Sequence, residues 1–375
     1  MKLFTNYFLL SALLILFSSS LWGEQNSEQN LTDSDVSSIE TDKWMGEMWG
    51  YISNRTLNEI SLPGSHDSGM NVDDIVLNPI GCRAANVANT GTQSKNIEGQ
   101  LNEGSRYFDI RPAVIDPSKY NGTRWITAHV GVVADSTLGC EGESLKSIRE
   151  GLHNFFLDSE HESELVILKI SHCGEEPAFF SSGYSCSDTE LKHIASSLDI
   201  DGRLIKFAKS DSFTLKTISL KELIDKGNVL LLVDGVSEPE KGIFSVGHEC
   251  NDDYYLYDKY ANKNNYPDMK TDQHTKLTTD ASHTMTCDGT DYKRNFLLSW
   301  TLTLSEAEAI AGVPAILVIA PNATLKLEAD IKAWVSSGDI TKKYFPNIIY
   351  IDAVGSQATR SAIYINLHYE NLLDN

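Results

Sequence analysis

Two histidines and one arginine are the residues whose types and spacing could carry chemistry. His66 follows an apolar segment and a Pro–Gly turn in the sequence ISLPGSHDSG, Arg111 closes the segment YFDIR, and His129 closes the segment WITAH. An imidazole titrates near neutral pH, so two of them can serve as proton acceptor and proton donor, and a guanidinium fork stabilises negative charge. A single His–Asp pair is weak support for catalysis, whereas three such segments in succession strengthen it.

These residues need elements that bring them together. Short apolar runs alternate with stretches of helical length, such as 144–157 and 325–336, which indicates buried strands separated by helices. About eight such strands favour a closed parallel barrel, in which catalytic groups come from the carboxyl ends of the strands. An open doubly wound sheet is the alternative, but its glycine-rich nucleotide fingerprint is missing. The predicted strands are 59–62, 107–110, 125–128, 165–170, 229–233, 296–302, 315–320 and 348–352.

One predicted strand carries two charged residues of opposite sign. Asp109 and Arg111 are two positions apart, so alternation along a strand sends both side chains to the same face, toward the barrel mouth. A buried structural ion pair is the other interpretation of an isolated Asp-x-Arg sequence.

The order of these motifs resembles the catalytic X domain of phosphatidylinositol-specific phospholipases C. The resemblance is carried by LPGSHDSG (62–69), by QLNEGSRYFDIR (100–111) and by the next segment, which ends in His129; it extends to 164–168, 298–301 and 348–352. It implies an α/β fold, a distorted and incompletely closed (βα)8 barrel of the TIM type, in a single domain. One departure is Val130, which separates His129 from the glycine that usually follows this histidine in the family.

The resemblance also implies a reaction. His66 matches the general base that takes the proton of the inositol 2-hydroxyl, and His129 matches the general acid that protonates the departing glycerol oxygen. Arg111 would stabilise the charge on the phosphoryl oxygens. The products would be diacylglycerol and inositol 1,2-cyclic phosphate.

Supporting and binding residues follow from the same resemblance. Asp67 would support the second histidine and Asp352 would orient the first. Substrate contacts would come from Asp109, Lys169 and Trp300, although a lysine that reaches out of the barrel for structural reasons is an equal alternative for Lys169.

Arg111 also bears on metal dependence. In the calcium-dependent members of the family an acidic ligand occupies its position, and an arginine there resembles the metal-independent bacterial type, in which its charge replaces the cation. We therefore expect no metal and no other cofactor, and we interpret the acidic loop at 249–253 as solvated. Two alternatives stay open: a metal-dependent phosphodiesterase for another substrate such as a glycerophosphodiester, and a barrel that binds inositol or lipid without turnover.

The N-terminal segment and the cysteines indicate an exported protein. Residues 1–23 have the pattern of a cleavable signal peptide, residues 24–42 are polar and read as a disordered linker, and residues 43–375 form one catalytic barrel domain with an insertion at about 248–293. Six cysteines in such a chain suggest disulfides, with Cys173–Cys186 and Cys250–Cys287 as the first expected pairs. No CxxC pair supports a structural zinc site.

Composition limits the partners. A formal net charge of −21 argues against nucleic-acid binding and against electrostatic adsorption to an anionic membrane. We expect a secreted or periplasmic monomer whose partner is an inositol phospholipid, with transient membrane contact through Trp44, Trp49 and Tyr51 or through the tyrosines of the insertion.

Overall fold

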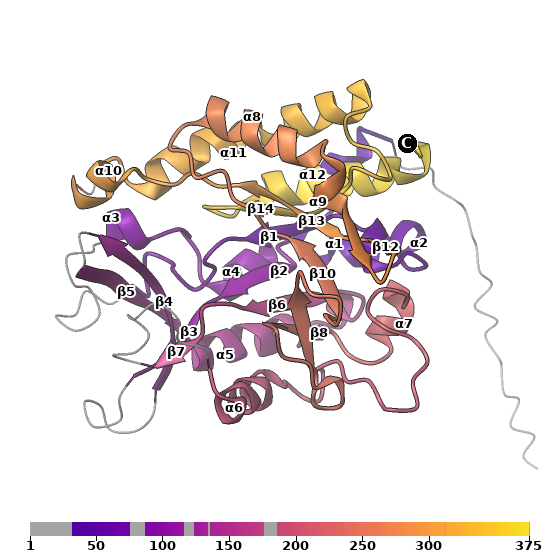
Figure 1. The fold of residues 1–375 in the computed structure, drawn as a ribbon, viewed down its shortest axis with the longest axis horizontal. Coiled ribbons are helices and arrows are strands. Elements are labelled where there is room, and N and C mark those ends of the chain that lie inside the picture. The colour runs from indigo at the N-terminus through magenta and orange to yellow at the C-terminus, as the bar shows by residue number, and fades with distance from the viewer. Residues whose placement is uncertain are drawn as a thin grey trace, which may run out of the picture.

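The computed structural model describes residues 32–75, 87–115, 124–133, 136–175, 186–311 and 313–374. Eight parallel strands form a closed barrel with helices around it, so the predicted fold class is confirmed (Figure 1). The resemblance implied incomplete closure, and in this respect the structure differs, because β1 pairs with both β14 and β2. In order around the barrel the strands are β1 (Leu62–Ser65), β14 (Pro346–Ile351), β13 (Asn295–Trp300), β10 (Tyr254–Tyr257), β9 (Ile243–Gly247), β8 (Val229–Asp234), β6 (Val166–Ile170) and β2 (Tyr107–Ile110).

Helices cover the barrel unevenly. No helix lies between β8 and β9 beyond the short turn Pro239–Lys241, and none of the described elements separates β9 from β10, which distorts the βα repeat. The helices are α1 (Trp44–Glu47), α2 (Trp49–Ile52), α3 (Val87–Thr90), α4 (Ile97–Asn102), α5 (Leu145–Phe155), α6 (Asp188–Leu198), α7 (Leu220–Ile224), α8 (Tyr266–Leu277), α9 (Asp280–His283), α10 (Glu306–Ala311), α11 (Ile316–Ser337) and α12 (Ser356–His368).

Strand alternation decides which residues reach the barrel interior. Phe108 and Ile110 of β2 pack in the apolar layer that contains Ile148 and Leu152 of α5, outside the barrel. The intervening residues Tyr107 and Asp109 therefore point inward, as the two-residue period requires. The predicted helix at 144–157 is confirmed as α5, which the Ser144 side chain caps by accepting a hydrogen bond from the Ser147 amide.

His129 reaches the site from a different sheet than predicted. The strand expected at 125–128 lies within β4 (Arg124–Val133), which belongs to a four-stranded sheet with β5 (Ser136–Ser144), β3 (Pro112–Ile115) and β7 (Gly174–Glu175). Since β3 continues β2 and β7 follows β6, this sheet extends the barrel wall beyond its carboxyl end. An apolar run does not reveal its pairing partners, so the sequence could not separate a barrel strand from this one.

The apolar run at 315–320 was wrongly predicted to be a strand. It forms the first part of α11, while Leu325–Ser336 confirms the predicted helix as the second part of the same element. Short apolar runs are ambiguous between strand and helix by periodicity alone.

The predicted insertion at 248–293 is also partly wrong. Tyr254–Tyr257 is the barrel strand β10, and β9 immediately before the segment was not predicted at all. The remaining part holds α8, α9 and a hairpin of β11 (Thr284–Cys287) and β12 (Thr290–Lys293). The segment is rich in tyrosine and aspartate, so β10 was not predicted as a strand, although it is short and buried in the barrel wall.

The folded part of the chain begins earlier than expected. Within the predicted linker, Val36 and Ile39 are buried in the main core, so residues 32–42 are not a disordered segment. The predicted signal peptide and residues 24–31 lie outside the described residues.

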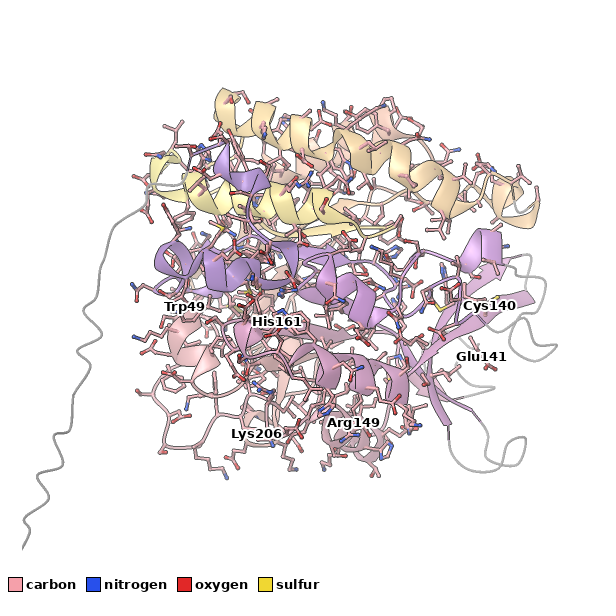
Figure 2. The ribbon with its side chains drawn as sticks, turned by 180° about the vertical axis from the view of Figure 1, so that it is seen from behind. Trp49, Cys140, Glu141, Arg149, His161 and Lys206 are labelled. Carbon is pink, nitrogen blue, oxygen red and sulfur yellow. A yellow bond between two sulfur atoms is a disulfide. The ribbon has the colours of Figure 1, made fainter. Side chains whose placement is uncertain are left out.

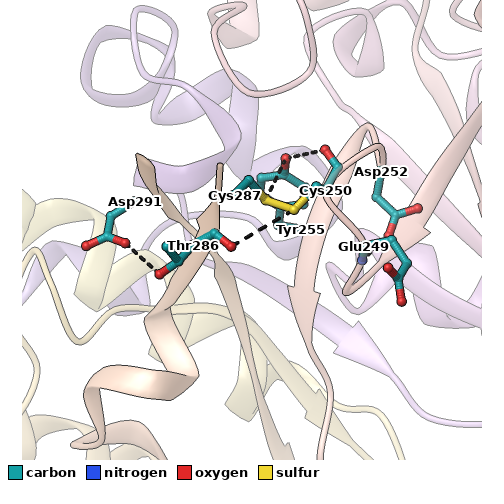
Figure 3. The surroundings of a disulfide bond; sticks show 7 residues. All are labelled: Glu249, Cys250, Asp252, Tyr255, Thr286, Cys287 and Asp291. Carbon is teal, nitrogen blue, oxygen red and sulfur yellow. Dashed lines mark hydrogen bonds between the residues drawn. A yellow bond between two sulfur atoms is a disulfide. The ribbon is translucent and has the colours of Figure 1, made fainter. Parts of the chain in front are cut away.

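Both expected disulfides are present. Cys173 is bonded to Cys186, and Cys250 is bonded to Cys287, which ties the loop after β9 to the β11–β12 hairpin (Figure 3). In the same loop, Asp252 accepts a hydrogen bond from the Glu249 amide at 2.8 Å. Cys82 lies outside the described residues. None of the helices in the described ranges combines the length and apolarity needed to cross a membrane.

Candidate active site

A cavity of about 570 Å³ opens where the carboxyl ends of the barrel strands meet the four-stranded sheet, α3 and α10. The structure brings most of the predicted site residues to it. Its wall includes His66, Asp109, Arg111, His129, Lys169 and Asp352.

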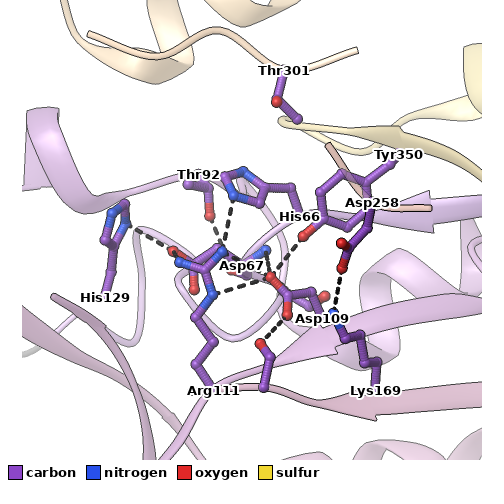
Figure 4. A network of polar contacts seen from close by, with 12 residues as sticks. His66, Asp67, Thr92, Asp109, Arg111, His129, Lys169, Asp258, Thr301 and Tyr350 are labelled. Carbon is purple, nitrogen blue, oxygen red and sulfur yellow. Dashed lines mark hydrogen bonds and ion pairs between the residues drawn. The ribbon is translucent and has the colours of Figure 1, made fainter. Parts of the chain in front are cut away.

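His66 lies directly after β1 and is held from both sides. Its Nδ1 donates to Asp352 Oδ1 at 2.7 Å, and Arg111 Nη2 donates to its Nε2 at 3.1 Å (Figure 4). Because a guanidinium only donates, Nε2 accepts and the proton of the neutral ring is on Nδ1. Burial lowers the pKa of His66, but the charge and hydrogen bond of Asp352, together with the charge of Asp67, outweigh it and the pKa is raised. The ring is thus a base with its lone pair on Nε2.

Asp352→Asn is expected to displace the acid limb of the pH profile of kcat/KM to lower pH. The carboxylate raises the pKa of His66, so its removal lowers that pKa, and the base is neutral at a lower pH than in the wild type. The rate at the plateau should also fall by about a hundredfold or more, because the amide does not hold the same tautomer. Asp201→Asn, on the exposed pair with His153, is the control. An unmoved acid limb would contradict the assignment of Asp352.

Asp67 links the arginine to the second histidine. Its carboxylate oxygen Oδ2 lies 3.0 Å from Arg111 Nη1 and 2.8 Å from His129 Nδ1. The loop achieves this because Asp67 adopts a left-handed backbone conformation with φ of 46°, which aspartate tolerates better than most residues. Since Asp67 occupies Nδ1, Nε2 of His129 is the nitrogen left for a substrate. The expected support of His129 by Asp67 therefore has the right geometry.

Arg111 lies between the two histidines (Figure 4) and is fixed by carboxylates. Asp109 Oδ2 accepts from its Nη2 at 2.9 Å and its Nε at 3.1 Å. Burial alone would raise the pKa of Asp109, but the guanidinium and Lys169, with the Ser171 hydrogen bond, together lower it far below its usual range, and the arginine stays charged. Arg111 keeps 17% of its side chain exposed toward the cavity.

The Asp109 carboxylate is used by the protein itself. Besides Arg111, it accepts hydrogen bonds from the Tyr350 hydroxyl, at 2.6 Å, and from Ser171. Asp109 was predicted to bind substrate, whereas its contacts are those of a residue that positions Arg111.

Lys169 faces the other side of the cavity. Its Nζ lies 2.6 Å from Asp258 Oδ2 and 3.8 Å from Asp234 Oδ1. Burial lowers the pKa of Lys169, but these two carboxylates outweigh it, so the ammonium is retained. The lysine thus lines the cavity instead of reaching away from the barrel into solvent.

Trp300 lies elsewhere than predicted. Its side chain is 1% exposed, its Nε1 donates to the Ala323 carbonyl in α11, and its ring packs against Trp334. It belongs to the core behind the barrel wall, and its neighbours Ser299 and Thr301 line the cavity instead. The alternation of β13 explains the difference.

Several cavity residues were missed at the sequence level. Asp234 ends β8, Asp258 directly follows β10, and His172 is the second residue after β6, so each had the signal of a polar residue at the carboxyl end of a strand. A strand was predicted at 229–233, but Asp234 after it was not considered as a site residue. The strand before Asp258, β10, was not predicted. No group of three metal-binding side chains occurs in the part of the chain that the structure describes.

Fold and site together define a parallel αβ barrel with a His–Arg–His array at the carboxyl ends of its strands. Solved structures with a similar fold are bacterial phosphatidylinositol-specific phospholipases C. The enzyme from Listeria monocytogenes aligns with a TM-score of 0.51 and 15% identity over 87% of this chain and 98% of that chain. One from Staphylococcus aureus aligns with a TM-score of 0.54 and 15% identity over 86% and 98%. No family model and no curated sequence matches. The resemblance is therefore confirmed for the fold.

Proposed function

We propose that this protein is a metal-independent phospholipase C-like lyase that cleaves phosphatidylinositol or a related inositol phospholipid. The observation that carries the proposal is the continuous array from His66 through Arg111 and Asp67 to His129, in which two imidazoles flank one guanidinium. The fold shared with bacterial phosphatidylinositol-specific phospholipases C supports the substrate class.

The reaction assigns one proton to each histidine. His66 Nε2 takes the proton of the inositol 2-hydroxyl while that oxygen forms a bond to phosphorus. The bond from phosphorus to the glycerol oxygen breaks, and His129 Nε2 gives a proton to that oxygen. Arg111 donates to the non-bridging oxygens, where charge develops. Diacylglycerol leaves, and inositol 1,2-cyclic phosphate remains with the phosphate charge unchanged.

Phosphorus NMR of phosphatidylinositol in phosphatidylcholine vesicles tests the proposal directly. We expect a cyclic phosphodiester signal to appear at the same rate with and without a chelator, because Arg111 supplies the positive charge between Asp67 and Asp109. Activity lost on chelation would favour a metal-dependent phosphodiesterase instead. Binding of inositol without any cyclic product would favour a non-catalytic barrel.

A membrane surface would meet the protein at α10 and α11. The sequence from Ala309 to Leu325 has no charged residue, Ala309 and Ile316 line the cavity, and Val313 and Val318 are 70% and 62% exposed. Apolar side chains beside the cavity mouth suit contact with lipid around a diacylglycerol leaving group. The net charge of the protein is negative, so an anionic membrane would repel it, and this apolar contact would instead suit a neutral membrane surface.

Of the aromatic residues first considered for membrane contact, Tyr260 of the predicted insertion is 61% exposed and lines the cavity, whereas the tryptophans lie elsewhere. Trp44 is fully buried, and Trp49 lies at the opposite end of the molecule from Cys140, which pairs with His129 across β4 and β5 (Figure 2). Two disulfides support the further proposal that the protein acts outside the cytoplasm, as a secreted or periplasmic enzyme.

Replacing Val313 and Val318 together by aspartate is expected to weaken vesicle binding and lower activity on vesicles about tenfold or more, since each charge must be desolvated at the lipid surface. Activity on a short-chain, monomeric phosphatidylinositol should stay unchanged. Leu157→Asp is the matched control, because Leu157 is 69% exposed and follows α5 at the other end of the barrel. Equal losses in the control and the double variant would argue against this surface. Vesicle sedimentation and the two assays provide the measurements.

A further inference from the structure

The cavity holds a third histidine that the reaction above does not use. His172 lies at the carboxyl end of β6, its imidazole lines the cavity together with Arg111 and Lys169, and the residue is exposed. Among the described residues its ring has no hydrogen-bond partner. It differs in this from His66 and His129, whose rings are each fixed by a carboxylate.

The backbone at His172 is held in an unfavourable conformation. Its φ is 47°, a left-handed value that is uncommon among non-glycine residues. Both neighbours are fixed. The Ser171 amide donates to the Ile110 carbonyl at 2.9 Å and its side chain contacts Asp109, while Cys173 is bonded to Cys186. The surrounding structure therefore enforces the conformation that turns this residue to the cavity.

The electrostatic surroundings indicate what the ring faces. Partial burial of the ring in the cavity is the largest influence on the pKa of His172 and lowers it, and the positive charge of Arg111 lowers it further. The imidazole is therefore neutral near pH 7, and it retains one N–H donor. Its proximity to Arg111 places this donor beside the guanidinium that would bind the phosphate.

Resting on the proposed function, we propose that His172 is a substrate-binding residue that donates a hydrogen bond to an anionic phosphate oxygen held by Arg111. Asp234 and Asp109 line the same cavity and would attract a further cation away from the phosphate. A neutral donor at this position adds a contact to the phosphate and avoids that competition. The fixed backbone holds the residue at the cavity before substrate arrives, so only the ordering of its side chain reduces the binding free energy.

Two substitutions separate the side chain from the backbone strain. His172→Gly removes the ring and adopts a positive φ without strain, and His172→Asn tolerates the same backbone and keeps an N–H donor. We expect inorganic phosphate to bind about tenfold more weakly to the glycine variant, the effect of one hydrogen bond to a charged group, and the asparagine variant to retain most of the affinity. Thermal stability should remain close to that of the wild type in both. His153→Asn, on the outer face of α5, is the control.

NMR of the histidine rings locates the contact. The His172 signal, assigned by its loss in His172→Asn, is expected to shift when phosphate is added and to stay in place when free inositol is added. A shift with inositol alone would overturn the proposal, as would equal phosphate affinity in the glycine variant and the wild type. These measurements need no turnover, so they can succeed or fail whether or not the protein cleaves inositol lipids. If it does, kcat/KM of the glycine variant should fall by a similar factor, with rescue by asparagine.

Discussion

His66→Ala and His129→Ala are each expected to lower kcat/KM on phosphatidylinositol by about 10²–10⁴-fold, the contribution of a positioned general base or acid. The two losses should differ when the leaving group is changed. In a nitrophenyl ester of inositol phosphate the leaving group is nitrophenolate, which departs without protonation, so His129→Ala should recover much of its rate on this substrate. His66→Ala should not recover, because the 2-hydroxyl must still lose its proton.

The control for this pair is His153→Ala, which removes an exposed imidazole outside the cavity. Steady-state rates on both substrates provide the measurement. Full activity of either histidine variant on phosphatidylinositol would end the proposed mechanism. Recovery of His66→Ala instead of His129→Ala would reverse the two roles.

Arg111→Lys and Arg111→Gln are expected to lower kcat by about 10²–10³-fold, because neither side chain reproduces the planar fork at the phosphoryl oxygens. Their stabilities should differ. Lysine keeps a positive charge for Asp67 and Asp109, whereas glutamine removes the cation that these two buried carboxylates share, a change that costs about 3–5 kcal/mol. Urea unfolding and steady-state kinetics measure the two effects separately.

The pH dependence checks this reasoning. The pKa of Asp67 and Asp109 is lowered in the folded protein: burial raises it, and the Arg111 charge together with the other cationic neighbours outweighs burial. Groups with a lowered folded pKa stabilise the protein above their unfolded pKa, and this contribution is lost as the pH falls through the folded value. The destabilisation of Arg111→Gln should therefore be fully present near neutral pH and decrease below about pH 4, where the unfolded carboxyls begin to bind protons. A pH-independent difference would contradict it.

The neighbouring arginine shows why the sequence motif needs a structure. Arg106 and Arg111 stand five positions apart in the same motif, yet Arg106 is fully buried and pairs with Glu164 at 2.7 Å, where it joins β2 to the segment before β6. Only Arg111 reaches the cavity. The resemblance selected the arginine that lines the cavity, whereas charge and spacing alone could not.

Strand parity and chemistry were set by the sequence itself. The expected Pro–Gly turn was wrong, because Pro63 and Gly64 lie inside β1 and pair with β14. The period of two in β2 places Asp109 on the inward face, and imidazole and guanidinium fix what the groups can do. These properties depend on neighbouring residues along the chain. They can therefore be read without knowing the fold.

The tertiary structure decided which distant segments meet. It brought His129 in through a second sheet, placed Asp234, Asp258 and His172 on the cavity wall, turned Trp300 into the core and made the run at 315–320 a helix with an exposed apolar face. The physical reason is that strand pairing and burial are non-local. The same apolar run satisfies its backbone in a helix, a barrel or an antiparallel sheet, and only packing against the rest of the chain selects among them.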